Sequence, residues 1–325
     1  MKIRILVIYI CFAVISITTK AQRINFEYEA APLNSGFKMD GYWIWGGSLI
    51  KVDSVYHLFA SRWPKRSEFP DGYRNHSEIV RATADNPMGP FKFKEVIIGE
   101  RDSSYWDSNM AHNPTIHKVD DHFVLFYIGS DFTTKLNGSD YLLRRVGYAS
   151  SKSIDGPWER MDEPLFEQES NNPAFLMDDN KVLLLFRDEK LQTYMAEAPS
   201  YKGPYTVINN NVWPYHKIED FYLFKSNEGY HIVCEDNVGG ISSHVRWGVH
   251  LFSEDGINNW SKYKNPIVYD HDIEYYNDSI FHCTRRERPQ LYVENQKITH
   301  LFTSVLGEGE SWCQPMKLKQ PIDVK

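Results

Sequence analysis

The sequence predicts an all-β protein, a five-bladed β-propeller with four antiparallel strands in each blade. A hairpin pattern recurs five times along the chain, and a second pattern with a Gly-Pro or Gly turn follows four of the hairpins. Aromatic residues make up 14% of the 325 residues, which favours strands over helices. Four strands in a repeat of about 50 residues is typical of a propeller blade.

Each of the five hairpins opens with a polar residue or glycine, usually followed by proline. An apolar stretch, a polar turn and a second apolar stretch come next. The opening residues, called openers here, are Gly46, Asn113, Asn172, Asp220 and Arg288. An apolar or aromatic residue stands ten positions after each opener, as expected where the second strand of a hairpin begins. These residues are Tyr56, Phe123, Val182, Tyr230 and Ile298.

The second pattern predicts the third and fourth strands of the first four blades. A short strand-like stretch leads to a glycine turn, and an aromatic residue follows. A β-sandwich with the same spacing by coincidence is the alternative fold. We find no linker, so residues 22–325 are predicted to form a single propeller domain, with Gln22–Lys38 adding a strand or clasp to the last blade. The four turns lie at Gly89-Pro90, Gly156-Pro157, Gly203-Pro204 and Gly256.

Residues 1–21 have the layout of a secretory signal peptide. Lys2 and Arg4 precede an apolar run over Ile5–Ile17, and small residues lead to a cleavage site after Ala21. A buried first strand or an uncleaved anchor is the alternative. We therefore expect a periplasmic or secreted protein that has no membrane attachment after cleavage.

Charge and cysteine content exclude several classes of protein. The formal net charge is −7 and no basic block occurs, which argues against a nucleic-acid partner or an anionic membrane surface. The mature chain retains Cys234, Cys283 and Cys313 without a CxxC pair, so a zinc ribbon has no support. An odd number of cysteines allows one disulfide with a free thiol, or no disulfide, and we expect three buried cysteines that act as apolar side chains. We expect a monomer.

In a propeller, the first strand of each blade lines the central channel and its opener faces the mouth. The residues before the openers join the same ring. Most of these positions are polar or ionisable, and burying them without a function is costly. A solvated channel mouth with structural ion pairs, such as Glu287 with Arg288, is the alternative. The ring is predicted to hold Trp45, Gly46, His112, Asn113, Asn171, Asn172, Glu219, Asp220, Glu287 and Arg288.

The openers, the strand Tyr56–Phe59, Asn113-Pro114, Glu219-Asp220 and Arg286–Pro289 resemble the five-bladed propeller glycoside hydrolases. That group includes glycoside hydrolase families 43, 32 and 117. The resemblance implies carboxylates from different blades around a sugar-sized pocket, with aspartates on blades one and three and a glutamate acid on blade four. One carboxyl group protonates the leaving oxygen, and the other activates water or attacks the anomeric carbon.

The match to that pattern is partial. Glu219 fits the general acid, and Asp220 stands beside it. Gly46 and Asn172 occupy the openers where the resemblance implies aspartates. Asp40, a few residues before blade one, is our candidate base. Asp220, Glu287 and Asp107 are further candidates for catalytic carboxylates, as supports or replacements for that acid and base.

Substrate contacts are predicted by residue type. Trp45 and Trp106 can stack on sugar rings, although packing between blades would also explain them. The polar contacts include His112, Asn113 and Asn172. Arginines beside the channel strands can bind an acidic sugar or pair with the carboxylates of the site itself. These arginines are Arg62, Arg187, Arg286 and Arg288.

The predicted function is that of an exported glycoside hydrolase that acts on a plant or algal oligosaccharide or polysaccharide. No cofactor is required. The resemblance allows a structural calcium ion in the channel, but no dense acidic loop demands one. Two alternatives stay open: a non-catalytic carbohydrate-binding propeller, and a propeller glycoside phosphorylase. The second needs one carboxylic acid and a cationic phosphate pocket, which Arg286, Arg288 and His112 could form.

Overall fold

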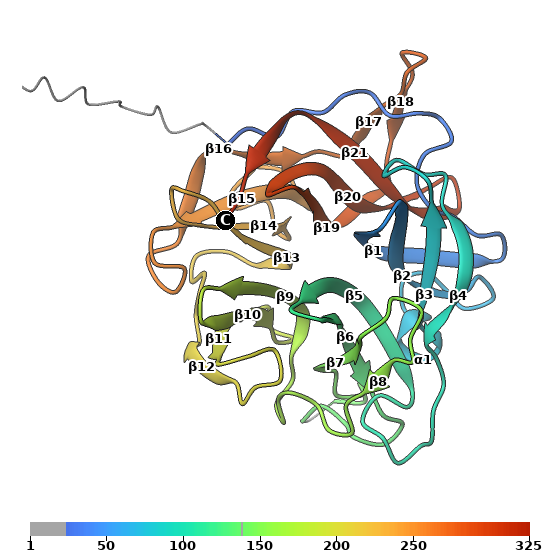
Figure 1. Cartoon of the computed structure of the whole chain (residues 1–325), viewed down its shortest axis with the longest axis vertical. Coiled ribbons are helices and arrows are strands. Elements are labelled where there is room, and N and C mark those ends of the chain that lie inside the picture. The colour runs from blue at the N-terminus through green and yellow to red at the C-terminus, as the bar shows by residue number, and fades with distance from the viewer. Residues whose placement is uncertain (1–23, 138) are drawn as a thin grey trace, which may run out of the picture.

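The computed structural model describes residues 24–137 and 139–325 of the chain. Five blades follow one another around a central channel in chain order (Figure 1), which confirms the predicted all-β five-bladed propeller. The helix α1 (Tyr73–His76) is a single turn between the second and third strands of blade one. The predicted signal peptide lies outside the described residues. In the described part of the chain, no helix is both long and apolar enough to cross a membrane.

The first four blades are four-stranded antiparallel sheets whose strands follow chain order outward from the channel. The first strands of neighbouring blades contact one another around the centre of the ring. The strands of blade one are β1 (Tyr42–Val52), β2 (Val55–Pro64), β3 (Glu78–Ala84) and β4 (Lys92–Ile98). Those of blade two are β5 (Met110–Val119), β6 (His122–Ser130), β7 (Arg145–Ser151) and β8 (Glu159–Arg160). Blade three contains β9 (Asn171–Asp178), β10 (Lys181–Arg187), β11 (Thr193–Ala198) and β12 (Thr206–Asn209). Blade four contains β13 (Ile218–Lys225), β14 (Tyr230–Asp236), β15 (Trp247–Ser253) and β16 (Ser261–Tyr269).

The fifth blade is completed by the N-terminal segment. Its own strands are β19 (Arg285–Glu294), β20 (Lys297–Gly307) and β21 (Glu310–Asp323). Tyr28 forms an antiparallel bridge with Leu318 on β21, and the Glu29 amide donates a hydrogen bond of 2.9 Å to the Lys317 carbonyl. The start of the described chain therefore pairs with its last strand and joins the two ends of the ring. A separate hairpin, β17 (Asp272–Glu274) and β18 (Ile280–His282), precedes this blade.

The apolar core is divided among the five interfaces between neighbouring blades. Each of the five buried clusters draws its side chains from two adjacent blades; Phe126 of β6 and Phe175 of β9, for example, stack with ring centres 4.8 Å apart. The middle strands β2 and β10 are buried along almost their whole length because another blade covers each of their faces. The high aromatic content supplies this packing. Cys234, Cys283 and Cys313 are buried and free, so they act as small apolar side chains.

The predicted hairpin register agrees with the structure. Each residue predicted to begin a second strand lies at, or one position after, the first residue of β2, β6, β10, β14 or β20. The structure adds a feature that the register alone does not show. All five openers have a left-handed backbone, with φ of 65° at Gly46, 52° at Asn113, 54° at Asn172, 57° at Asp220 and 55° at Arg288.

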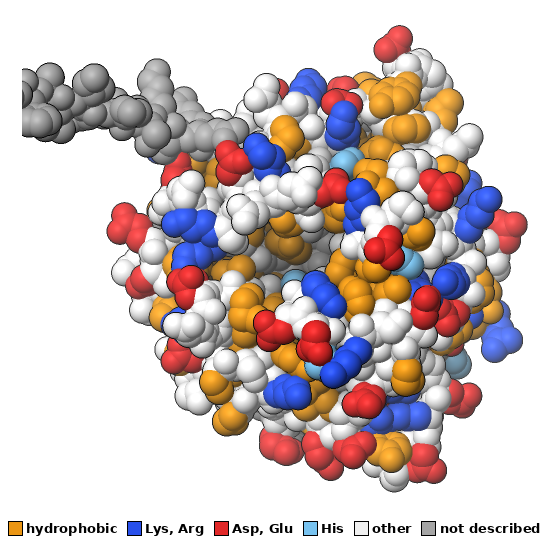
Figure 2. Space-filling view, viewed as in Figure 1, with side chains coloured by type: hydrophobic (Ala, Val, Ile, Leu, Met, Phe, Trp, Pro, Cys, Tyr) orange, Lys and Arg blue, Asp and Glu red, His pale blue; other side chains and the backbone are white. Residues whose placement is uncertain are grey.

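A β-bulge explains this shared conformation. In every blade the first strand has one extra residue at the opener relative to the second strand; in blade four Glu219 faces Glu235 and Tyr222 faces Val233. A bulge re-aims neighbouring side chains, and its left-handed residue favours Gly, Asn or Asp. Four of the five openers are of these types. The bulges turn the openers and the residues before them toward the channel mouth. On the face of the ring drawn in Figure 2, acidic and basic side chains are interspersed.

Candidate active site

A pocket of about 350 Å³ occupies the mouth of the channel, at the ends of the first strands that carry the bulges. Trp45, His112, Asn172, Asp220 and Glu287 line it, so every blade contributes a side chain. The opposite ends of the same strands line a separate hollow of about 660 Å³. The bulged ends therefore define one distinct pocket. Blades three to five give it a charged wall, and blades one and two give it an aromatic wall together with the charged side chains of Asp71, Arg74 and Arg144.

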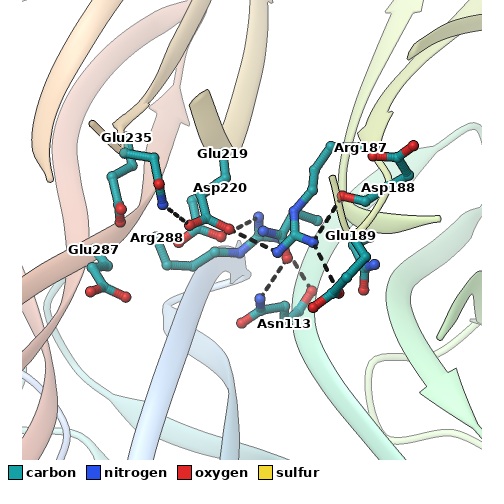
Figure 3. A network of polar contacts seen from close by, with 12 residues as sticks. Asn113, Arg187, Asp188, Glu189, Glu219, Asp220, Glu235, Glu287 and Arg288 are labelled. Atoms are coloured by element: carbon teal, nitrogen blue, oxygen red, sulfur yellow. Dashed lines mark hydrogen bonds and ion pairs between the residues drawn. The ribbon is translucent and has the colours of Figure 1, made fainter. Parts of the chain in front are cut away.

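Four carboxyl groups gather at the charged wall. Glu219 and Asp220 come from β13, Glu235 from β14 and Glu287 from β19 (Figure 3). One oxygen each of Asp220, Glu235 and Glu287 lies within 4.8 Å of the others. Glu235 faces Glu219 directly across the strand pair. Blades four and five thus bring several acidic groups close together.

Burial raises the pKa of the three clustered acids. It raises the pKa of Glu287 to about 7 and that of Asp220 to about 6, while Arg246 and Arg288, respectively, partly offset the effect. Burial, together with the charge of Glu287, raises the pKa of Glu235 well above its usual range. A buried carboxyl group with like charges nearby keeps its proton at higher pH. The cluster can therefore hold protons near neutral pH.

Glu219 has a different environment from these three groups. Its Oε2 accepts a hydrogen bond of 2.8 Å from Arg187, and its Oε1 accepts one of 2.5 Å from the Asn237 amide. Both oxygens thus accept hydrogen bonds, one of them from a cation, and these two bonds hold the side chain in place. Glu219 and Glu287 line the same pocket. The pocket therefore presents one carboxylate with charged support and one carboxyl group that can carry a proton.

Guanidinium groups cross-link this wall. Arg246 donates to Glu235 at 3.0 Å and to Glu287 at 2.7 Å. Arg288 lies beneath the pocket, fully buried, where it donates to the Asn113 carbonyl at 3.2 Å and lies 3.7 Å from an oxygen of Asp220 (Figure 3). Breaking such buried pairs is costly because the remaining charge has no partner. The arginines therefore fix the positions of the acids.

Another part of the pocket wall is aromatic. Trp45 and Trp63 line the pocket together with Phe69 and Tyr73 from the β2–β3 connection. Phe69 stacks on Trp63, with ring centres 5.7 Å apart. Aromatic faces pack against the apolar faces of sugar rings by the same physics that pairs them with each other.

His112 also lines the pocket, next to the aromatic wall. It is buried, its ring stacks on Tyr73 at 4.3 Å, and its Nδ1 lies 2.8 Å from the Ser77 hydroxyl. Burial and the nearby charge of Arg288 hold its pKa well below the usual range. A neutral imidazole held in this way can exchange a hydrogen bond with a ligand hydroxyl through Nε2. It is a polar contact rather than a cation.

The structure brings most of the predicted site residues to the pocket. The predicted residues that line it are Glu219, Asp220, Glu287, Trp45, His112, Asn113, Asn172 and Arg187. Arg288 lies directly beneath them.

The other predicted residues lie elsewhere. Asp40 is exposed and does not line the pocket. Asp107 is buried within blade two, where it binds Arg160 and the Tyr127 hydroxyl. Arg62 pairs with Glu78 at 2.7 Å, and the Trp106 indole donates to the Met161 carbonyl. The Arg286 side chain donates to the carbonyls of Asp270 and Asp272.

Sequence reasoning missed Glu235, Arg246, Arg285, Phe69 and Tyr73. Glu235 could have been found because the hairpin register places it opposite Glu219. Phe69, Tyr73 and Arg246 lie on connections between strands, where the repeat gives no register. Arg285 begins β19, three positions before the opener Arg288, so the register could have found it as well.

The acidic cluster does not fit a calcium ion well. Calcium takes roughly six to eight oxygen ligands. Here Arg246 already donates to two of the three carboxyl groups, and Arg288 lies 3.7 Å from the third. Each of the three carboxyl groups therefore already has a guanidinium group as a neighbour.

No protein-family model and no curated protein matches the chain. Solved structures do match. A family 117 glycoside hydrolase, Zg3597 of the marine bacterium Zobellia galactanivorans, matches with a TM-score of 0.67 at 16% identity over 92% of each chain. The catalytic domain of the Coprinopsis cinerea GH62 alpha-L-arabinofuranosidase has a TM-score of 0.64 at 11% identity, covering 92% of this chain and 99% of that one. The compost-metagenome GH43 beta-xylosidase/alpha-arabinofuranosidase CoXyl43 has a TM-score of 0.63 at 13% identity, covering 92% and 97%.

The chain thus has the five-bladed propeller fold found in glycoside hydrolases of families 117, 62 and 43. The resemblance to families 43 and 117 is confirmed at the level of the fold. Identities of 11–16% extend the likeness no further than the fold. The activity has to be argued from the pocket itself.

Proposed function

We propose that the chain is a glycoside hydrolase and that Glu219 and Glu287 are its catalytic pair. The observation that carries this proposal is their position on the charged wall of one pocket that also has an aromatic wall. Glycoside hydrolysis requires two carboxyl groups in different protonation states beside the scissile bond. The solved structures that share the fold include several glycoside hydrolases, which supports the same reaction class.

The environments assign the roles of the two groups. Glu287, with its pKa raised to about 7, holds the proton that passes to the leaving oxygen. Glu219, supported by Arg187 and Asn237, acts as the carboxylate that activates water or attacks the anomeric carbon. This reverses the role predicted for Glu219 from sequence and replaces Asp40 as its partner. Asp220 lines the same pocket, and its negative charge, with that of Glu219, helps to keep Glu287 protonated.

We further propose that the enzyme is exported and acts on a plant or algal oligosaccharide or polysaccharide. The signal-peptide pattern of residues 1–21 supports export. The matching structures include a hydrolase of a marine bacterium and a complex of BT0996 that is named for RGII. These names describe those proteins, and they point to the glycans with which a search should begin.

A non-catalytic carbohydrate-binding propeller is the second candidate. It is favoured by Gly46 and Asn172, which stand at openers where the family resemblance implies aspartates. The pocket would then bind a sugar through its aromatic wall and leave it intact.

The deciding experiment measures hydrolysis of a plant and algal oligosaccharide panel by wild type, Glu219→Gln and Glu287→Gln, without added phosphate. We expect each variant to lose about 10²–10⁴-fold in kcat while it still binds the glycan. Glu68→Gln is the control, because Glu68 is exposed and does not line the pocket. Full activity in either catalytic variant would refute its role. Binding without cleavage by wild type would favour the second candidate, and cleavage that requires phosphate would indicate a phosphorylase.

A further inference from the structure

The pocket contains an unusual number of arginines. Five guanidinium groups line it and no lysine does, although the whole chain carries a net charge of −7. If all five paired fully with the carboxylates of the pocket, they would be explained by structure alone. Their individual partners therefore decide whether one of them is available to a ligand. The five residues are Arg74, Arg144, Arg187, Arg246 and Arg285.

Four of these arginines already have partners within the protein. Arg144 donates to the Tyr73 hydroxyl at 2.5 Å and also pairs with Glu189. Arg187 and Arg246 hold the carboxyl groups of the charged wall, as described above. Arg74 pairs with the exposed Asp71, and its guanidinium group leans over the ring of Tyr141, which does not line the pocket.

Arg285 differs from the other four. Within the described residues its side chain makes no hydrogen bond, and its single ion pair is a loose one, with Nη1 3.5 Å from Oε1 of Glu287. Arg246 already donates to that same oxygen at 2.7 Å. The Arg285 guanidinium group lies 5.6 Å from the ring centre of Phe69, and its side chain is 31% exposed. Its donors are therefore open to the pocket.

The charge balance around Arg285 leaves its positive charge only partly compensated, because its one ion-pair partner, Glu287, is shared with Arg246. Glu219 is matched by Arg187, and Asp220 lies beside Arg288. Glu287 is shared by two guanidinium groups. Burial raises the pKa of Glu287 to about 7, so its negative charge is incomplete near neutral pH. A free cation in a partly enclosed pocket attracts an anion more strongly than it would in open water.

We propose that Arg285 forms a subsite for an oxyanion carried by the bound glycan, a carboxylate of a uronic acid or a sulfate ester. This rests on the proposed function, because it requires a glycan in the pocket. The planar guanidinium fork binds such oxygens through paired hydrogen bonds. Phe69, beside Arg285, supplies an apolar face for the sugar ring, and Glu287 lies next to both. The anionic sugar is therefore held beside the proposed proton donor.

The test measures binding to the full chain by calorimetry. The probes are oligogalacturonides, their carboxyl-reduced neutral counterparts, sulfated galactan oligosaccharides and inorganic phosphate. The proteins are wild type, Arg285→Gln, Arg285→Lys and the control Arg66→Gln, which removes an exposed arginine outside the pocket. Thermal unfolding curves verify that each variant is folded.

We expect wild type to bind one acidic glycan at least about tenfold more tightly than its neutral counterpart. Arg285→Gln should abolish that preference without weakening the binding of the neutral glycan. Arg285→Lys should keep part of the preference, because the positive charge remains although the planar guanidinium fork is lost. Arg66→Gln should match wild type. The preference should also fall as salt concentration rises.

The possible results distinguish failure of the proposed subsite from failure of the proposed hydrolase activity. Equal binding of acidic and neutral glycans, a preference that survives Arg285→Gln, or no binding of any acidic glycan would overturn the proposal. Binding of phosphate through Arg285 without a preference among glycans would also overturn it and would indicate a phosphate co-substrate. An acidic glycan that binds through Arg285 but is not cleaved supports the subsite and refutes the hydrolase.

Discussion

Replacing Arg246 with methionine tests the assignment of Glu287 as the proton donor. Arg246 donates to Glu287 at 2.7 Å, and among the neighbouring charges it does most to lower the pKa of that group. Two unit charges about 4 Å apart interact by roughly 4 kcal/mol at an effective dielectric constant near 20. Because the Arg246 side chain is 30% exposed, we reduce this to about 1.5–2.5 kcal/mol. At about 1.4 kcal/mol per unit, the pKa of Glu287 should rise by roughly one to two units.

The assay is the pH dependence of kcat/KM on a cleaved oligosaccharide. The donor must be protonated, so the rate of the wild type should fall as pH rises through about 7, the pKa of Glu287. In Arg246→Met this alkaline limb should move to higher pH by the same one to two units, while Arg66→Met should keep the wild-type profile. An alkaline limb that stays in place in a folded, active Arg246→Met variant would refute Glu287 as the titrating donor.

Two further predictions concern stability. Asp107→Asn should reduce the free energy of unfolding by about 3–5 kcal/mol, since Arg101 and Arg160 then lose their buried counter-charge, and denaturant titration measures this loss. The folded variant should still cleave glycans, and a loss of cleavage would indicate that Asp107 has a role in the active site. Burial lowers the pKa of His117 to about 4 and that of His231 to about 3. At these two positions the unfolded chain therefore binds more protons below about pH 6.5, so their contribution to stability falls as pH drops from 6.5 toward 4. The melting temperature of wild type should drop more steeply over this range than that of His117→Gln, and an equal slope would contradict this.

The sequence predicted the strands well because the repeat is a direct consequence of blade geometry. Each hairpin packs between two other blades, so its apolar residues recur at the same distance from the opener, as Tyr56 and Ile298 show. The same register located Glu219, Asp220 and Glu287 at the mouth. Site residues on the first strands were therefore predictable from the fold.

Residues outside that register could not be placed by position along the chain. Asp107 and Trp106 lie only a few residues before β5, yet their side chains pack within blade two. Phe69 reaches the pocket from the β2–β3 connection, which follows no repeat. The role of Glu219 also depends on the hydrogen bond that it accepts from Asn237. The two residues are 18 positions apart, and no pattern in the sequence indicates this contact.

Arg288 shows how the fold and the site depend on each other. It is the one opener that is neither glycine, asparagine nor aspartate, and a left-handed backbone at such a residue costs of order 1–3 kcal/mol. Its side chain lies fully buried between blades, where it donates to the Asn113 carbonyl and stands 3.7 Å from Asp220. Glycine or asparagine would relieve the backbone but would leave Asp220 without its nearest positive charge. The strained backbone therefore persists because the guanidinium group beneath the pocket stabilises the acids above it.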